Sequence, residues 1–356
     1  MTRPIRARID LDALRHNYQL AARHAAGAKL WAVIKANGYG HGALRIARGL
    51  QAEADGFALI ELDTAIALRE AGIKQPLLML EGFYSADELP IFVQHGLTPV
   101  VHRMDQAHSL IQSGLKLPLY LKLNTGMNRL GLNVDEFAAA LDVLRGRDIT
   151  LMTHFSDADE AYGIAHQLGR LNAMCGGLSR PRSLANSAAL LRFPETCCDW
   201  ARPGIMLYGS SPFPAMQSAA QIGLQPVMTL ESELIAVREL EPGDRVGYAG
   251  VYIADRAMKI GVVACGYGDG YPRLAPSGTM ILVEGQKTRT IGRVSMDKIC
   301  VDLTGIVTAK VGSAVTLWGA GEFAKISADD VAASASTVSY ELFCALAARV
   351  LVVEHG

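Results

Sequence analysis

The 356-residue sequence contains little that indicates disulfides, membranes or nucleic acid. It has six cysteines, without Cys-x-x-Cys spacing and too sparse for a disulfide scaffold, so no metal cluster is indicated. The basic residues after Met1 lead into no apolar stretch, and no run is long enough to span a membrane, which favours a cytoplasmic protein. The formal net charge of −1 provides no field to attract nucleic acid or an anionic membrane. We therefore expect a small-molecule partner.

The first half of the chain alternates short apolar runs with helical patterns, the latter including Asp63–Ala71, Asp105–Ser113, Val134–Leu144 and Asp159–Cys175. A doubly wound sheet would fit this alternation, but eight strand-helix units in roughly 180 residues favour a (β/α)8 barrel. The eight runs are Trp31–Lys35, Phe57–Glu61, Leu77–Glu81, Thr98–His102, Leu119–Asn124, Ile149–His154, Arg182–Asn186 and Ile205–Gly209.

After Ser211–Pro214 the pattern changes to long strands and tight turns. Only Ser327–Ser336 and Ser339–Ala348 read as helices in this part. We predict an α/β chain with a (β/α)8 barrel domain at 1–223, followed by a mainly-β C-terminal domain at 224–356. The strands predicted in the second domain are Val227–Leu240, Lys259–Cys265, Met280–Val283, Thr288–Val294, Ile299–Leu303 and Ala314–Trp318.

Lys35 closes the first apolar run and is followed at once by the glycine-rich stretch Ala36–Gly42. Functional groups on parallel-strand folds gather at the carboxyl ends of strands. Partial burial there lowers a lysine pKa and supplies the free amine that Schiff-base chemistry needs. The alternative is a strand-end lysine whose stem packs while its amine reaches water.

Other polar residues also follow predicted barrel strands and would converge on the same face as Lys35. Asn186 and Ser187, with the segment Arg202–Ile205, could present a hydroxyl and backbone N–H groups to a phosphate. Taken alone, Asn186 and Ser187 are equally typical of a helix cap, and His154 of a structural histidine.

Two glycine-bearing stretches, Gly38–Gly42 and Trp318–Gly321, lack G-x-G-x-x-G spacing, and no Walker motif is present. A dinucleotide site is therefore not expected. Tyr248 and Tyr267 lie in glycine-rich turns of the second domain, where tyrosine is usually a packing residue.

Seven motifs in order make the chain resemble alanine racemase along essentially its whole length. The resemblance implies a pyridoxal 5′-phosphate (PLP) enzyme that interconverts L-alanine and D-alanine. It also implies a head-to-tail homodimer in which both subunits build each active site. The motifs are Val33–Gly42, Lys122–Gly131, Thr153–Asp159, Arg202–Ile205, Val246–Gly250, Gly266–Arg273 and Gly292–Asp297.

The resemblance implies a two-base mechanism. Lys35 would hold PLP as a Schiff base and serve one face of the substrate, and Tyr248 of the partner subunit would serve the other face. Residues matching His154 and Arg202 would form the positive network that favours an ionised phenol. Arg202 would also meet the pyridine nitrogen, which should stay unprotonated because arginine keeps its proton.

The remaining site residues are carried over in the same way. Arg129 would bind the substrate carboxylate, helped by the backbone of Met296 from the other subunit. Lys122 matches a lysine that is carbamylated in some members and orients the arginine. The phosphate would be held by Tyr39, Asn186, Ser187, Gly204 and Ile205, and the access route would be lined or supported by Asp159, Tyr267, Arg273, Arg293 and Asp297.

The chain departs from the family pattern at a few positions. Asn124 stands where many members carry Asp, Asn128 where Gly or His is common, and Ser295 where some have Cys. Ala348 stands near a tyrosine that reaches the phosphate in some members, which implies one donor fewer and a wider inner access route.

Three other functions stay open at this point. A broader-specificity racemase of small amino acids fits the Ala348 departure. A non-catalytic PLP carrier has the same barrel but usually lacks the second domain, and a barrel-type decarboxylase of basic amino acids needs room for a longer substrate. For a racemase, making D-alanine for peptidoglycan and breaking it down are both compatible with the sequence.

Overall fold

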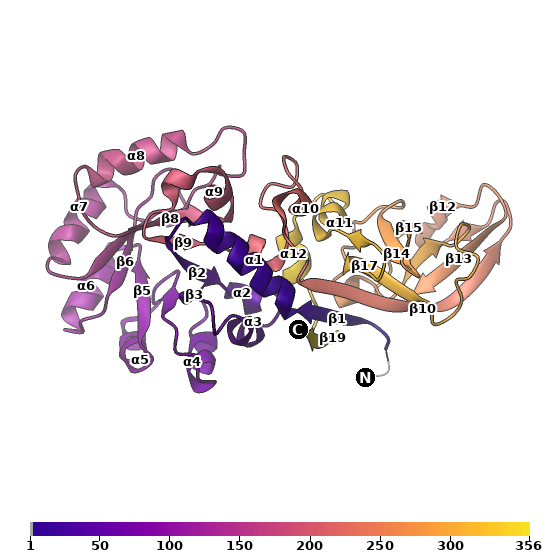
Figure 1. Cartoon of the computed structure of the whole chain (residues 1–356), viewed down its shortest axis with the longest axis horizontal. Helices are drawn as coiled ribbons and strands as arrows, with labels where there is room; N and C mark the ends of the chain where they lie inside the picture. The colour runs from indigo at the N-terminus through magenta and orange to yellow at the C-terminus, as the bar shows by residue number, and fades with distance from the viewer. Residues whose placement is uncertain (1–2) are drawn as a thin grey trace.

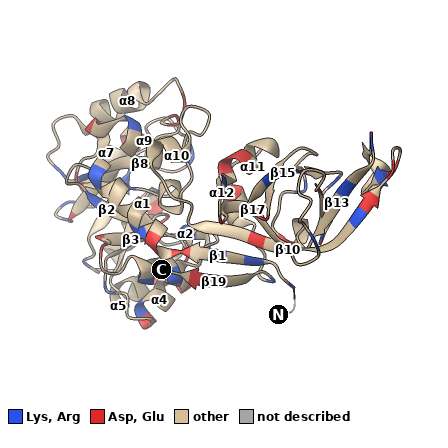
Figure 2. Ribbon diagram, turned by 45° about the vertical axis from the view of Figure 1, so that its right-hand side comes forward, with Lys and Arg blue, Asp and Glu red and all other residues tan. Residues whose placement is uncertain are grey.

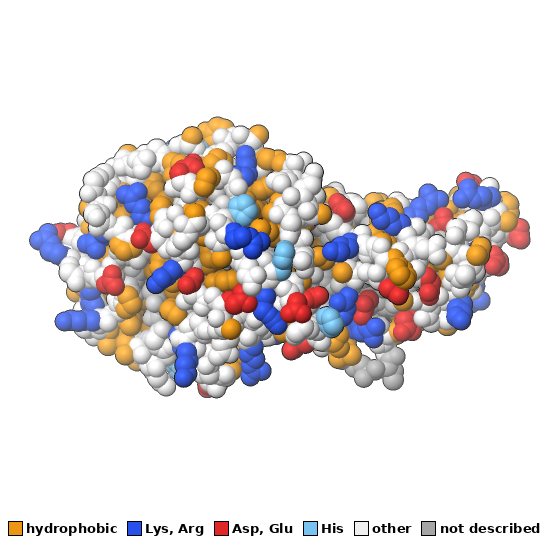
Figure 3. Space-filling view, viewed as in Figure 1, with side chains coloured by type: hydrophobic (Ala, Val, Ile, Leu, Met, Phe, Trp, Pro, Cys, Tyr) orange, Lys and Arg blue, Asp and Glu red, His pale blue; other side chains and the backbone are white. Residues whose placement is uncertain are grey.

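The computed structural model describes residues 3–356, which form a closed barrel and a mainly-β second domain. The first two residues of the predicted first domain lie outside the described residues. The barrel and its surrounding helices form the wide part of the molecule, and the second domain extends from it as a narrower arm (Figures 1 and 3). The predicted fold class, a (β/α)8 barrel followed by a mainly-β domain, is confirmed.

Eight parallel strands close the barrel, and the pairing of Lys29 with Trp200 joins the last strand to the first. The strands are β2 (Lys29–Val33), β3 (Gly56–Leu59), β4 (Leu77–Met79), β5 (Leu97–Val101), β6 (Leu119–Lys122), β7 (Ile149–Met152), β8 (Arg182–Asn186) and β9 (Trp200–Arg202). The helices of this half are α1 (Leu11–His24), α2 (Lys35–Tyr39), α3 (Ala43–Gly49), α4 (Leu62–Glu70), η1 (Ala86–Glu88), α5 (Leu89–Gln94), α6 (Met104–Gln112), α7 (Val134–Val143), α8 (Ala165–Cys175), α9 (Ser187–Arg192), η2 (Pro194–Thr196), η3 (Ile205–Tyr208) and α10 (Ala219–Ile222).

Two sequence-based assignments in the barrel are wrong. Ile205–Gly209 was predicted as the eighth strand but forms η3, and the strand is β9 just before it. The η3 side chains are buried on all sides, so the run lacks the polar alternation that separates a strand from a buried helical turn. Helix α8 begins at Ala165 instead of Asp159, because Gly163 adopts a left-handed conformation with φ +71° just before it.

The second domain contains a nine-stranded sheet in the order β18-β17-β14-β15-β16-β13-β10-β1-β19. Each of its six predicted strands overlaps an observed one. The sheet strands are β1 (Arg6–Asp10), β10 (Met228–Leu240), β13 (Met258–Val263), β14 (Met280–Val283), β15 (Gln286–Ile291), β16 (Ile299–Asp302), β17 (Ala314–Ala320), β18 (Lys325–Ile326) and β19 (Leu351–His355). The other elements are the hairpin β11 (Arg245–Val246) and β12 (Tyr252–Ile253), the turns η4 (Tyr248–Gly250) and η5 (Tyr267–Asp269), and the helices α11 (Ala328–Ser334) and α12 (Ser339–Cys344).

The first strand of the chain belongs to the sheet of the second domain. β1 pairs antiparallel with β10 and parallel with β19, so the first and the last strand lie side by side in this sheet. The sequence analysis placed these residues in the barrel domain, 1–223. A pairing between residues more than 200 positions apart leaves no local pattern from which it could be predicted.

Contacts between the two domains bring α12 to the end of the first barrel strand. The ring of Tyr340 lies 5.9 Å from that of Tyr39, and Phe343 packs edge-on against His41 at 5.0 Å. The carboxylate of Asp329 accepts a hydrogen bond from the backbone N–H of Ser211 at 3.0 Å. Residues of the second domain can therefore reach the mouth of the barrel in the same chain.

Residues that carry charges of both signs are interspersed along the ribbons of both domains (Figure 2). Within residues 3–356, no helix is both long and apolar enough to cross a membrane.

Candidate active site

A cavity of about 720 Å³ opens at the carboxyl ends of the barrel strands. Most of the predicted site residues of the barrel come from the loops that follow different strands, and the closed barrel brings them together. Eleven predicted residues line this cavity: Lys35, Tyr39, Lys122, Arg129, His154, Asp159, Asn186, Ser187, Arg202, Gly204 and Ile205.

Lys35 begins a left-handed turn. The four residues Ala36–Tyr39 all have positive φ, between +51° and +63°. For residues with a side chain this conformation costs about 1–2 kcal/mol each, so the turn needs support from its surroundings. Glu61 accepts a hydrogen bond from the N–H of Ala36 at 2.8 Å, and the Asn37 side chain accepts one from the start of α3 at 3.0 Å.

His41 supports the far end of the turn. Its Nδ1–H donates to the carbonyl of Tyr39 at 2.8 Å, and burial lowers its pKa to about 4, so the ring is neutral. The turn thus fixes Lys35 at one end and Tyr39 at the other, both facing the cavity.

Gly38 offers a test of this turn. A Cβ there would lie 3.2 Å from the N atom of Ala43 and from a side-chain carbon of Ile46, at a φ of +63°. We expect Gly38→Ala to lower the free energy of unfolding by about 2 kcal/mol and to weaken cofactor binding. The control is Gly72→Ala, where φ is +85° but no atom lies within 4 Å. It should cost about 1 kcal/mol and leave cofactor affinity unchanged. Equal cofactor affinity in both variants would contradict a positioning role for the turn.

The cavity is rich in positive charge. Lys35, Lys122, Arg129 and Arg202 all line it, and within residues 3–356 none has a carboxylate oxygen within 4 Å. Burial and the neighbouring Arg129 lower the pKa of Lys35. Burial and the surrounding cations hold the pKa of His154 well below its usual range, so its imidazole is neutral. Such a site fits a ligand that carries anionic groups.

The lowered pKa of Lys122 predicts a pH dependence of the unfolding free energy that can be tested. Burial, then Arg202 and Arg129, lower its pKa from 10.5 to about 8. Between these values the unfolded chain still holds a proton that the folded chain has released, so stability should rise with pH across this window. Relative to Lys122→Met, the wild type should gain at most about 3 kcal/mol of unfolding free energy from pH 8 to 10.5. Urea unfolding at both pH values measures this, with the exposed Lys74→Met as control. Parallel wild-type and Lys122→Met profiles would contradict it.

Arg202 is buried at the end of β9 and is held by backbone oxygens. One terminal nitrogen donates to the carbonyl of Ser183 at 2.7 Å and to its hydroxyl at 2.6 Å, and the other donates to the carbonyl of Thr153 at 2.6 Å. Within residues 3–356 its Nε has no acceptor. Burial lowers its pKa to about 10, so it stays protonated at neutral pH. The side chain is thus a fixed cation at the floor of the cavity.

One wall of the cavity presents hydroxyls beside close-packed backbone. Asn186 caps α9 by accepting from the N–H of Ala189 at 2.9 Å, and it lines the cavity as well. The next residue, Ser187, accepts a hydrogen bond from the N–H of Gly204 at 2.8 Å. A Cβ on Gly204 would lie 2.6 Å from the hydroxyl of Tyr39, so only glycine lets these groups come together. Hydroxyls and a helix start suit a phosphate.

The loop before Arg129 is organised by two of the departures from the family pattern. Asn128 has φ +55°, a conformation that asparagine tolerates. The side-chain amide of Asn124 donates to that of Asn128 at 3.0 Å and accepts from its backbone N–H at 3.0 Å. The two asparagines therefore form a pair that shapes the turn leading to Arg129.

The predicted residues of the second domain do not line the barrel cavity of their own chain: Tyr248, Tyr267, Arg273, Arg293, Met296 and Asp297. Arg273 and Arg293 line a separate hollow of about 480 Å³ in that domain. Tyr248 is 71% exposed and Met296 is 53% exposed.

Tyr340 and Cys344 were not predicted as site residues, yet both reach the cavity from α12. Only the packing of one domain on the other places them there, so no local pattern could have identified them. Ala348, where a lost donor was inferred, does not line the cavity of its own chain. Within residues 3–356, no group of His, Cys, Asp or Glu side chains is arranged to hold a metal ion.

Comparison with known proteins gives full-length matches. The family descriptions "Alanine racemase, N-terminal domain" and "Alanine racemase, C-terminal domain" match residues 9–212 and 227–353. The chain is 52% identical to the catabolic alanine racemase of Klebsiella aerogenes over 99% of both chains. It is 53% identical to the alanine racemase of Nitrosospira multiformis over 98% of this chain and 99% of that one. The solved biosynthetic alanine racemase of Pseudomonas aeruginosa has a TM-score of 0.95 at 42% identity, over 100% of both chains.

Proposed function

The chain belongs to the alanine racemase family and interconverts L-alanine and D-alanine, and we propose that it does so with two bases, Lys35 and Tyr248 of the partner subunit. Racemisation requires that a proton leave one side of Cα and return on the other, so two groups must act on opposite faces. The family depends on PLP, and we propose PLP as the cofactor of this cavity.

The observation that carries this proposal is the lysine amine in a cavity whose four cations have no carboxylate oxygen of residues 3–356 within 4 Å. A PLP phosphate and a substrate carboxylate together supply the anions that such a cavity needs. The lowered pKa of Lys35 favours the free amine, which is the form that bonds to the aldehyde of PLP and that accepts a proton from Cα.

The residues present fit PLP. Ser187 and Tyr39, with the backbone of Gly204 and Ile205, would hold the phosphate, and Asn186 would orient Ser187 by capping the helix that begins there. When bound, PLP supplies a conjugated ring that accepts electron density from Cα as the proton leaves.

Arg202 and His154 would set the protonation of the site. The free Nε of Arg202 is a donor that keeps its proton, so it would leave the pyridine nitrogen unprotonated. Tyr248 of the partner subunit, as the second base, would lie near the fixed positive charge of Arg202. His154 is neutral in the field of Arg202 and would serve as a hydrogen-bond partner of the phenol.

Arg129 would bind the substrate carboxylate, and its loop is held by the Asn124 and Asn128 pair. Lys122 has a partly neutral amine near pH 8, which is the form that reacts with carbon dioxide. A carbamylated Lys122 would give Arg129 a nearby anionic partner, since no carboxylate oxygen of residues 3–356 lies within 4 Å of it.

A head-to-tail homodimer would join the two halves of the site. The barrel of one subunit holds the cavity, and the second domain of the other would bring Tyr248, Met296 and the access residues to it. The exposure of Tyr248, 71% in a single chain, supports this arrangement because a catalytic tyrosine needs a less aqueous surrounding. Asp159 from the barrel and Tyr267, Arg273, Arg293 and Asp297 from the partner would line or support the access route.

Mixed dimers test the shared site directly. Lys35→Ala and Tyr248→Phe chains with different tags are coexpressed, and the mixed dimer is purified through both tags. One of its two sites then has both bases, so we expect about half of the wild-type activity although each homodimer is nearly inactive. A mixed dimer as inactive as its parents would reject the shared site.

A further inference from the structure

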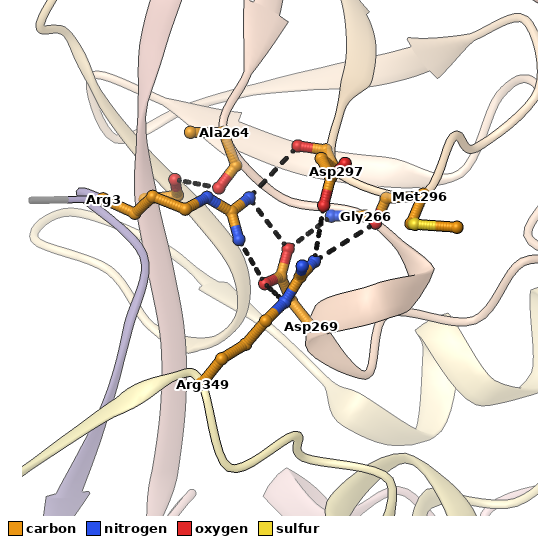
Figure 4. A network of polar contacts seen from close by, with 8 residues as sticks. Arg3, Ala264, Gly266, Asp269, Met296, Asp297 and Arg349 are labelled. Atoms are coloured by element: carbon orange, nitrogen blue, oxygen red, sulfur yellow. Dashed lines mark hydrogen bonds and ion pairs between the residues drawn. The ribbon is translucent and has the colours of Figure 1, made fainter. Parts of the chain in front are cut away.

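A buried carboxylate in the second domain ties together parts of the chain that are far apart in sequence. The side chain of Asp269, in η5, is fully buried. Arg3, before β1, donates to both of its oxygens at 2.6 and 3.1 Å, and Arg349, before β19, donates to it at 2.8 Å (Figure 4). The N–H of Gly266 also donates to it at 2.9 Å. The carboxylate is therefore held from three directions.

The same two arginines reach the loop that carries Met296. Arg349 donates to the carboxylate of Asp297 at 2.7 Å and to the carbonyl of Met296 at 3.5 Å, and Arg3 donates to the carbonyl of Asp297 at 3.2 Å. We call the set Arg3, Asp269, Asp297 and Arg349 the arginine clamp. It joins the loop 266–270 to the loop 295–297 (Figure 4).

The two loops pack backbone against backbone. The N–H of Gly268 donates to the carbonyl of Met296 at 2.9 Å, and the N–H of Tyr267 donates to that of Ser295 at 3.0 Å. A Cβ on Gly266 would lie 2.2 Å from the Ser295 oxygen. A shift of either loop would therefore move the other.

The clamp leaves one backbone group of Met296 available. Its carbonyl oxygen is engaged, whereas within residues 3–356 its N–H has no acceptor. We propose that Asp269 is a positioning residue that aims this N–H at the substrate carboxylate bound in the partner's barrel. This inference rests on the shared site proposed above.

The first experiment compares Asp269→Asn with a matched control in the same domain. Asp302 is also largely buried, pairs with Arg289 at 3.3 Å and accepts from the N–H of Thr304 at 2.9 Å, but it lies on β16, outside the clamp. We expect Asp269→Asn to raise KM for L-alanine about tenfold with kcat within about twofold, because the affected contact is to the carboxylate and not to Cα. Asp302→Asn should lower the melting temperature and leave KM unchanged. An unchanged KM in folded Asp269→Asn would overturn the proposal.

Arg349→Gln keeps the proposal testable if Asp269→Asn does not fold. Arg349 is 41% exposed, so its loss leaves less unpaired charge in the interior. We expect a KM rise of about threefold, with kcat retained. A folded Arg349→Gln with wild-type KM, in the absence of folded Asp269→Asn, would overturn the proposal.

A mixed dimer shows whether Asp269 acts on the partner's site. In a dimer of Lys35→Ala and Asp269→Asn chains, the only site with Lys35 receives its Met296 loop from the Lys35→Ala chain, whose clamp is intact. The KM should then return to the wild-type value. A KM that stays raised would overturn the proposal, since Asp269 would then act on the cavity of its own chain. The mixed dimer of Lys35→Ala with Tyr248→Phe tests the shared site separately.

Discussion

Borohydride reduction of the Lys35→Ala variant is expected to leave no PLP covalently attached, and racemisation should fall at least a thousandfold or so in both directions. The variant loses the amine that bonds the cofactor and also loses one of the two bases. Burial and Arg129 lower the pKa of Lys35, whose amine stands at the start of a turn that fixes it toward the cavity. Mass spectrometry of reduced, digested protein locates the attached PLP.

The control for this variant is Lys122→Met, which removes another lysine from the same cavity. It should retain reducible PLP on Lys35 and lose activity mainly through weaker substrate binding. If PLP in the Lys35→Ala variant were found bonded to a different lysine with activity preserved, the assignment of Lys35 would be wrong.

Replacement of Tyr248 by phenylalanine should distinguish proton exchange at one face of the substrate from exchange at the other. We expect overall racemisation to fall about 10²–10³-fold. The two enantiomers have equal free energies, so kcat/KM must fall equally in both directions, and racemisation rates cannot show which base was lost. Exchange of the Cα hydrogen with deuterated water can, because each base takes the proton from one face only.

In Tyr248→Phe, Lys35 should still take the proton from D-alanine and return solvent deuterium to the same face, whereas exchange from L-alanine should be slow. This assignment of faces follows from the family resemblance. The control is Tyr252→Phe, since the hydroxyl of Tyr252 donates to the sulfur of Met258 at 3.4 Å, away from the proposed bases. This variant should behave as the wild type. Equal, mild losses of exchange from both enantiomers would rule out Tyr248 as the second base.

The barrel could be predicted because its strands are short apolar runs that end in polar residues, a local pattern. The error at Ile205–Gly209 arose because a fully buried turn and a fully buried strand have the same composition. The apolar pattern therefore does not distinguish them. The left-handed turn after Lys35 was also not predicted. It depends on Glu61, which lies 25 positions from Ala36 in the sequence, and on His41, whose ring packs against Phe343 of the second domain.

The candidate site was predictable to a similar degree. Residues at strand ends converge in any closed parallel barrel, so Lys35, Arg129 and His154 were correctly expected to face one cavity. Tyr340 reaches that cavity only because α12 packs on α2. This contact between domains cannot be predicted from the spacing of residues in the sequence. The roles of Tyr248 and Met296 came from the family resemblance alone, and they remain predictions.

The pairing of β1 with both β10 and β19 has a consequence for synthesis on the ribosome. β1 borders β10 and β19, which are made more than 200 residues later, so the nine-stranded sheet stays incomplete until β19 has been made. Until then, β1 exposes unpaired backbone edges that could associate with other nascent chains. Loss of the last six residues would expose one edge of β1 permanently, and such truncated chains should aggregate even though their barrels are whole.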